Sequence, residues 1–267
     1  LAGTGIGFGY ASATPPAVKW FPKEKVGLIA GLVVSGFGLA SVYTAPLTTW
    51  LAGQYGIGQT MLILGAAFLV VVVLLSQLLK APPAGYNPNA KSAGAGAAAA
   101  PADDYTPLEV LRTPQFYLLW FMYACGAGAG LMIIGKLAAI AQQQAGLALG
   151  FVLVAVLAIG NGAGRIAAGM LSDKIGRKPT LFIAFVSQAV LIFLMSRAAA
   201  DNFLGNAVVL SLLSALIGAN YGANLAIFPS ITKDFYGLKN FGVNYGLVFT
   251  SWGCGGFALA FAAGKVY

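Results

Sequence analysis

The chain has 267 residues, of which 59% are hydrophobic and 8% charged, and its mean hydropathy is +0.83. Soluble globular domains carry about 25% charged residues, so this composition excludes that class and indicates an all-α integral membrane protein. The net charge is +8, and in a membrane protein the useful question is on which side of the membrane the basic residues lie, rather than whether they bind nucleic acid. Because the chain has no histidine, a histidine-ligated metal is excluded. Cys125 and Cys254 have neither metal-ligand nor disulfide spacing. For a membrane protein of this kind we expect no cofactor and no enzyme activity.

Eight apolar segments follow one another along the chain, each with few or no charges. Most approach the roughly 20 residues that a helix needs to cross a bilayer, and all exceed the strands of a membrane barrel. They cover residues 1–18, 27–52, 59–79, 115–135, 147–171, 180–196, 206–229 and 241–263. The chain starts and stops at apolar runs, "LAGTGIGFGY" and "GKVY", without an initiator methionine, so we expect a fragment.

Basic residues alternate between the two sets of loops. The loops after the odd-numbered segments hold Lys19, Lys23, Lys25, Lys80, Lys91, Arg112, Lys174, Arg177, Lys178, Lys233 and Lys239. The opposite side holds Lys136, Arg197 and Lys265. Because cytoplasmic loops are enriched in lysine and arginine, the odd-numbered segments are predicted to end in the cytoplasm. We expect a multi-pass protein of a prokaryotic cytoplasmic membrane.

One connection differs from the others in length and composition. Residues 81–113 include "APPAGYNPNAKSAGAGAAAAPADDYTP", which is rich in proline, glycine and alanine. Such a composition predicts a flexible cytoplasmic linker. It divides the chain into two predicted helix bundles, residues 1–80 and 114–267.

The two predicted bundles contain a repeat. "KVGLIAGLVVSGFGLA" (25–40) aligns without gaps with "NFGVNYGLVFTSWGCG" (240–255) at an offset of 215 residues. Both copies enter the membrane from the same side. Parallel repeats in two six-helix halves resemble the plan of major facilitator transporters. On that resemblance the chain holds helices 4–6 and 7–11, and helices 1–3 and 12 are missing from it.

The loop "GMLSDKIGRKP" resembles the signature loop of the major facilitator superfamily. The matching positions are Gly169, Leu171, Asp173, Lys174, Gly176, Arg177 and Lys178. We interpret the loop as a gating latch, in which Asp173 accepts hydrogen bonds near a helix N-terminus and Arg177 and Lys178 pair across the loop. The alternative is a basic loop that only sets topology.

Arg165 is a cation inside the fifth apolar segment, with Asn161 one helical turn before it. An ionisable residue within a membrane helix is costly and suggests a functional site. The alternative is snorkelling, since a long arginine can reach the interface. Gly160, Gly164 and Ala168 recur every four residues and predict a close-packing face. We therefore expect Asn161 and Arg165 to line a cavity.

The seven acidic residues all lie in predicted loops or the linker, so Arg165 has no evident buried counter-ion. Because an unpaired buried charge is expensive, an anionic substrate is the predicted partner, and a guanidinium suits a carboxylate. Tyr10 and Tyr221 occupy matching places in the two halves and can donate to the same substrate. The alternative for each tyrosine is a helix–helix contact.

Several stretches resemble the oxalate/formate antiporter and related monocarboxylate branch of the major facilitators. They are "YTPLEVLRTPQFYLLWFMY", "GAGAGLMIIGKLAAIA", "NGAGRIAAGMLSDKIGRKP" and "FPKEKVGLIAGLVVSGFGLASVYTAPL". The resemblance implies a secondary carboxylate transporter in which Arg165 binds the anion and Asn161, Tyr10 and Tyr221 line the site. A co-transported proton or counter-transported anion is also implied.

Trp252 marks a departure from that resemblance. Oxalate-carrying members have a lysine at this position, just before a glycine, as a second cation for the dianion. One cation suits one carboxylate, so we expect a monocarboxylate such as lactate, pyruvate or formate, with Trp252 as an apolar wall and indole donor. The alternative role for Trp252 is simple packing. The alternative functions are oxalate/formate exchange or transport of another small solute. A non-transporting membrane sensor is the alternative from a different class.

Overall fold

The computed structural model describes residues 9, 12–14, 16–22, 25–80, 82–83, 86, 104–146 and 150–266. Every regular element within these ranges is helical, as the composition predicted. The helices are α2 (Val26–Ser76), α3 (Pro107–Arg112), α4 (Pro114–Gln143), α5 (Gly150–Ile175), α6 (Arg177–Ser196), η2 (Phe203–Gly205), α7 (Ala207–Tyr236) and α8 (Phe241–Val266). All but α3 and η2 are long and apolar enough to cross a membrane, so the chain is a multi-pass membrane protein.

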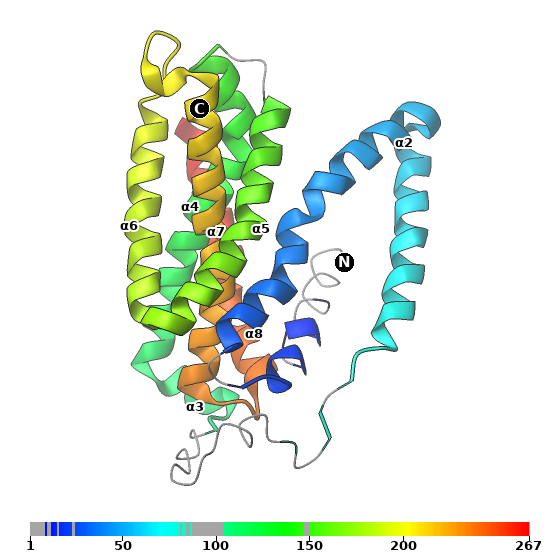
Figure 1. Ribbon diagram of the computed structural model, residues 1–267, viewed down its shortest axis with the longest axis vertical. Coiled ribbons are helices and arrows are strands. Elements are labelled where there is room, and N and C mark those ends of the chain that lie inside the picture. Colours follow the sequence, from blue (N-terminus) through cyan, green and yellow to red (C-terminus); the bar gives the residue numbers. More distant parts are fainter. Residues whose placement is uncertain are drawn as a thin grey trace.

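Helix α2 covers the predicted segment 27–52 and most of the predicted segment 59–79, which it follows as far as Ser76. Its helical path breaks at Gly56, whose φ of 73° and ψ of 167° lie in a region that glycine adopts without a side-chain clash. Figure 1 shows the first arm of α2 rising away from the bundle and the second arm descending apart from it. The two predicted segments are thus joined at a single glycine. The first predicted segment, 1–18, lies mostly outside the described residues.

Helices α4 to α8 form a bundle, with the first arm of α2 packed against α5 (Figure 1). One buried cluster lies at the end near α3 and includes Val110, Tyr123 and Phe228. A second cluster lies at the opposite end and includes Leu137, Leu153 and Leu210. Helices α2 and α8 begin at Val26 and Phe241, which matches the predicted repeat offset of 215 residues.

Helix α5 packs closely on both α7 and α2 because small residues face each neighbour. A methyl group at Gly160 or Gly164 would overlap the α7 backbone at Ala215 or Ala219. On the other side, a methyl group at Gly31 of α2 would overlap the Arg165 carbonyl. The predicted close-packing face at Gly160 and Gly164 is therefore present. It holds α5 between its neighbours and places Arg165 against α2.

The described part of the chain includes the end of the predicted linker, 81–113, from residue 104 on. Helix α3 begins with a capping box between Thr106 and Glu109, whose hydrogen bonds hold the pKa of the Glu109 carboxyl below its usual range. Asp104 accepts hydrogen bonds of 3.0 Å from the backbone N–H groups of Leu238 and Lys239. The flexible-linker prediction therefore extended too far, because these polar contacts tie residues 104–113 to the α7–α8 loop.

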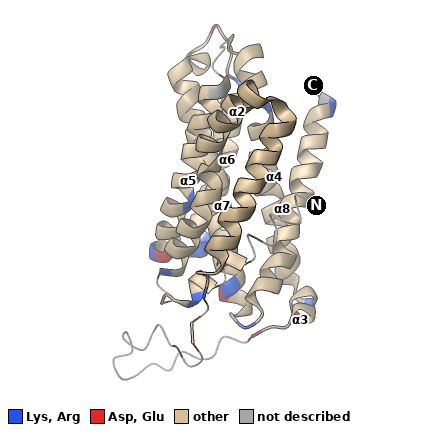
Figure 2. Ribbon diagram, turned by 90° about the vertical axis from the view of Figure 1, so that its right-hand side faces the viewer, with Lys and Arg blue, Asp and Glu red and all other residues tan. Residues whose placement is uncertain are grey.

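Most described lysine and arginine residues lie toward the end of the bundle where the linker enters (Figure 2). The ends of α5 and α7 and the starts of α2, α6 and α8 meet there (Figure 1). By the positive-inside rule this is the cytoplasmic end.

Candidate functional site

Arg165 lies within α5 and is fully buried, with an exposed fraction of 0%. Its Nε donates to Oδ1 of Asn161, one turn earlier, at 3.1 Å. Its Nη1 donates to the backbone oxygen of Val34 on α2. The guanidinium carbon also lies 5.5 Å from the centre of the Phe37 ring. The side chain is therefore enclosed between α5 and α2, and its predicted position on a cavity wall stays a prediction.

The guanidinium of Arg165 keeps donors that the described residues around it do not use. Its Nη2 is buried without a hydrogen-bond partner among the described residues. A guanidinium has five N–H donors, and the bonds to Asn161 and Val34 engage two of them. None of the ion pairs in the described part of the chain includes Arg165. A buried cation with open donors is chemically matched to an anion.

Tyr221 of α7 and Trp252 of α8 are brought into direct contact. The indole Nε1 donates to the Tyr221 hydroxyl at 2.9 Å. Tyr221 is buried, and Gly130 of α4 leaves room for its ring, since a methyl group there would overlap it. The hydroxyl oxygen accepts from Trp252, and among the described residues no acceptor is found for its own hydrogen, which can therefore be donated to a ligand. Tyr10, another of the predicted site residues, lies outside the described residues.

Aromatic contacts that the sequence did not predict surround these residues. Trp252 stacks on Phe249, with ring centres 5.5 Å apart and planes 6° apart. Tyr123 stacks on Phe228 at 4.1 Å. Phe37, beside Arg165, and Trp252 are separated by the repeat offset and hold matching positions in the two aligned segments. The repeat was the signal that could have identified Phe37.

Asp173 lies two turns after Arg165 and also contacts α2. Its Oδ1 accepts a hydrogen bond from Gly27 N at 3.0 Å, and its Oδ2 accepts one from Leu28 N at 2.9 Å. Both amides are in the first turn of α2, where N–H groups have no partner within the helix. The carboxylate also complements the positive end of the helix dipole. The predicted contact between Asp173 and a helix N-terminus is thus present.

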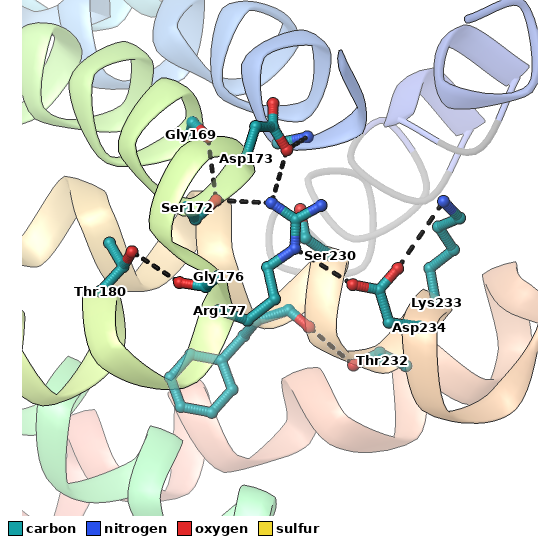
Figure 3. A network of polar contacts seen from close by, with 12 residues as sticks. Gly169, Ser172, Asp173, Gly176, Arg177, Thr180, Ser230, Thr232, Lys233 and Asp234 are labelled. Carbon is teal, nitrogen blue, oxygen red and sulfur yellow. Dashed lines mark hydrogen bonds and ion pairs between the residues drawn. The ribbon is translucent and has the colours of Figure 1, made fainter. Parts of the chain in front are cut away.

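Arg177, at the start of α6, links Asp173 to α7, as Figure 3 shows. Its Nη1 donates to Asp173 Oδ1 and to Ser172 Oγ, both at 2.6 Å. Its Nε donates to Asp234 Oδ2 at 3.1 Å, and Asp234 also pairs with Lys233 at 3.7 Å. One arginine therefore connects the cytoplasmic ends of α5, α6 and α7, and Asp173 extends the connection to α2.

The remaining residues of the predicted gating loop have different surroundings. Gly169 packs against the Gly27 carbonyl, where a methyl group would overlap it. Gly176 makes the turn between α5 and α6 with a φ of 95°. Lys174 and Lys178 are exposed, and no ion pair of theirs is found within the described chain. The predicted cross-loop pairing is therefore made by Arg177 and not by Lys178.

Similarity to known proteins agrees with this architecture. A sequence profile of the Major Facilitator Superfamily matches residues 1–260. The uncharacterized MFS-type transporter YhjX of Escherichia coli (strain K12) is 33% identical over 257 residues, covering 96% of this chain and 61% of that protein. The oxalate:formate antiporter of Oxalobacter formigenes is 30% identical over 249 residues, covering 92% of this chain and 56% of the antiporter.

A more distant relative is the apicoplast pyruvate carrier 1 of Toxoplasma gondii, which is 22% identical over 312 aligned positions, covering 94% of this chain and 55% of the carrier. The chain thus spans less than two thirds of the length of each of these relatives. The all-helical membrane fold, the charged network at the cytoplasmic helix ends and the profile match lead to one conclusion: the chain belongs to the Major Facilitator Superfamily.

Proposed function

We propose that this protein is a secondary transporter of a small monocarboxylate across a prokaryotic cytoplasmic membrane, with Arg165 as the anion-binding residue. The observation that carries the proposal is the state of Arg165, which is fully buried while Nη2 has no partner among the described residues. Burial of an unpaired charge is costly, so an anion that pairs with Arg165 stabilises the occupied site.

The donors around Arg165 favour a carboxylate. A guanidinium can present two parallel N–H groups to the two oxygens of a carboxylate. The Asn161 bond holds the guanidinium in place, and the Tyr221 hydroxyl can donate from α7. The names of two relatives point to the same chemistry, because oxalate, formate and pyruvate are all carboxylates.

The surroundings of Arg165 favour a substrate with one carboxylate group over a substrate with two. Trp252 stands where the family resemblance places a second cation for oxalate, and its indole is committed to Tyr221. Stacking on Phe249 gives this side an apolar wall. Formate, lactate and pyruvate fit a site with one cation and an apolar wall. Oxalate/formate exchange is the alternative that the relative's name suggests.

A mechanism follows from the contacts between α5 and α2. Near the cytoplasmic end α2 is buried against α5 from Val26 to Gly38, and beyond Gly38 its only buried residues in the described chain are Leu51 and Thr60. Figure 1 shows α2 diverging from α5 in that direction. In alternating access the bundles rock about the site. An anion at Arg165 lowers the cost of enclosing its charge, and opening toward the cytoplasm breaks the Asp173 contacts with α2.

The test is a thermal-shift panel on the full-length protein. We expect formate, lactate or pyruvate to raise the unfolding midpoint, with about 2.7 kcal/mol of stabilisation at 100 times the dissociation constant. Lactamide, which is uncharged, should produce no shift. Arg165→Gln should lose the carboxylate shift, and Arg197→Gln, a matched loop arginine, should keep it. An equal shift in the Arg165 variant would refute the site, and a shift by oxalate alone would favour the dianion.

A further inference from the structure

The close-packed contact between α2 and α5 ends near the place where Arg165 bonds to α2. Three glycines of α2 allow the helices to approach, because a methyl group at Gly27, Gly31 or Gly38 would press on the α5 backbone. Beyond Gly38, α2 diverges from α5 (Figure 1). The bond from Arg165 to the Val34 carbonyl lies one turn before Gly38. It therefore ties the two helices together close to the point at which they part.

The enclosure of Arg165 does not depend on helices outside this chain. Its side chain is already 0% exposed here, and further helices can add cover but cannot remove it. Gly38 narrows the contact, since a methyl group there would lie 3.2 Å from Nε of Arg165. The bond to Val34 joins two helices that are both in the chain, α2 before the linker and α5 after it.

Both two-pronged edges of the Arg165 guanidinium include a nitrogen that is already bonded. One edge is formed by Nε and Nη2, and the other by Nη1 and Nη2. Nε donates to Asn161 and Nη1 donates to Val34, while Nη2 has no partner among the described residues. A carboxylate that binds through two parallel N–H groups therefore competes with one of these two acceptors.

Val34 is the acceptor that can give way at the lower cost. Its carbonyl belongs to the helical part of α2, where the helix pattern also pairs it with the N–H of Gly38, four residues later. Val34 therefore keeps a backbone partner when it loses the guanidinium. Asn161 is on the same helix as Arg165 and moves with it, and its buried Oδ1 would lose this donor. A bond between two charged groups is also stronger than a bond to a neutral carbonyl.

We propose that the Arg165–Val34 bond locks α2 to α5 in the empty protein, and that the substrate anion releases the lock by taking Nη1 from Val34. This inference rests on the proposed function, because it requires an anion at Arg165. One carboxylate oxygen accepts from Nη1 and the other from Nη2, while Asn161 keeps Nε. The anion then binds the separated helices better than the locked ones, and that difference in affinity shifts the equilibrium.

The release begins at the Gly38 end of the contact, away from the cytoplasm. Asp173 holds the first turn of α2 through the amides of Gly27 and Leu28, and an anion at Arg165 leaves these bonds in place. Loss of the Val34 bond therefore extends the existing divergence of α2 from α5 toward the cytoplasmic end.

The test follows the reactivity of a thiol placed at the lock in the full-length protein. Val34→Cys keeps the backbone acceptor and puts the thiol at a position that is 2% exposed. Cys125 and Cys254 are exposed, so they and any other cysteine are first replaced by serine. A water-soluble maleimide should label the empty protein slowly. Saturating formate should raise the labelling rate about tenfold, the ratio expected for loss of one hydrogen bond to a charged group.

Three controls accompany this measurement. Sodium chloride at the same concentration should leave the labelling rate unchanged. Arg165→Leu has no donor for the carbonyl, so Val34→Cys in that background should label quickly without formate and should not respond to it. Ile227→Cys, on α7 and 0% exposed, should stay protected throughout. If the Ile227→Cys thiol reacts in the Arg165→Leu background, that variant has unfolded, and the formate effect with Arg165 present decides alone.

The unfolding midpoint of the Val34→Cys protein distinguishes the two ways of failing. If formate raises the midpoint and leaves the labelling rate unchanged, the anion binds without releasing α2, so the lock is wrong and the proposed function stands. Slower labelling in formate would mean that the anion closes the contact, and it would overturn the lock as well. If formate changes neither the midpoint nor the labelling rate, the proposed anion site is refuted together with the lock.

Discussion

Arg165 and Asp173 are charged residues on the same helix, roughly 12 Å apart along its axis, and both contact α2. Asp173 is saturated, because its two oxygens accept two α2 amides and the Arg177 guanidinium. Arg165 is more deeply buried and yet leaves Nη2 without a partner in the described chain.

Under the proposed function, this difference separates a contact that completes the fold from one that binds the substrate anion. A buried carboxylate with charge-assisted bonds to amides and a guanidinium stabilises the arrangement that it bridges. A buried guanidinium with open donors costs free energy until an anion arrives. We therefore expect changes at Asp173 to act first on the conformation of the bundle and changes at Arg165 to act first on substrate.

The largest expected effect is on transport when Arg165 changes. Arg165→Gln removes the charge, and loss of a charge-assisted pair worth about 3 kcal/mol predicts at least a roughly 100-fold fall in carboxylate uptake into proteoliposomes. Arg165→Lys keeps the charge and loses the paired N–H geometry, so uptake should fall about tenfold. Arg197→Gln should transport normally. If the lysine variant transports as the arginine protein does, two-pronged recognition is wrong.

A smaller effect is expected at Asp173, and on stability. Asp173→Asn removes the charge that Arg177 and the α2 amides share, so the free energy of unfolding should fall by about 2 kcal/mol. Asp201→Asn, in an exposed loop at the other end, is the control and should change it by less than about 0.5 kcal/mol. Combining Asp173→Asn with Arg177→Gln should cost less than the sum, because the two side chains share one contact. Strict additivity would show that the pair is not coupled.

The sequence predicted those features of Arg165 and Asp173 that depend on residues close to them along the chain. Asn161 and Arg165 are one turn apart, and that spacing alone brings their side chains together. The residues of the motif around Asp173 and Arg177 are also close together along the chain, so the sequence alone indicated a charged loop there. Apolar segment length predicted the membrane helices, since roughly 20 apolar residues are needed to cross a bilayer.

The sequence did not predict contacts that depend on how distant helices meet. Val34 offers Arg165 only a backbone oxygen, which carries no residue signal. Asp234 reaches Arg177 only because α7 ends beside the start of α6. The order of residues 104–113 was missed because linker composition outweighed the local capping box at Thr106. The join at Gly56 was missed because glycine is common throughout this chain.

The smallest effect concerns the pair that connects α7 to α8 beside the Arg165 site. Trp252→Phe keeps a ring on Phe249 and deletes the indole N–H, so the Tyr221 oxygen loses its donor. One net hydrogen bond is worth about 1 kcal/mol, which predicts about fivefold weaker carboxylate binding by calorimetry if the bond orients Tyr221.

Tyr221→Phe separates orientation from direct contact. If Tyr221 acts only through its bond with Trp252, the double variant should bind about as weakly as either single variant. If the Tyr221 hydroxyl also donates to the substrate, the Tyr221→Phe protein should bind the carboxylate more weakly than the Trp252→Phe protein does. The double variant should then bind as weakly as Tyr221→Phe alone. Unchanged binding in both single variants would make the pair a packing contact, and Arg165 would then be the one residue of this comparison that recognises the anion.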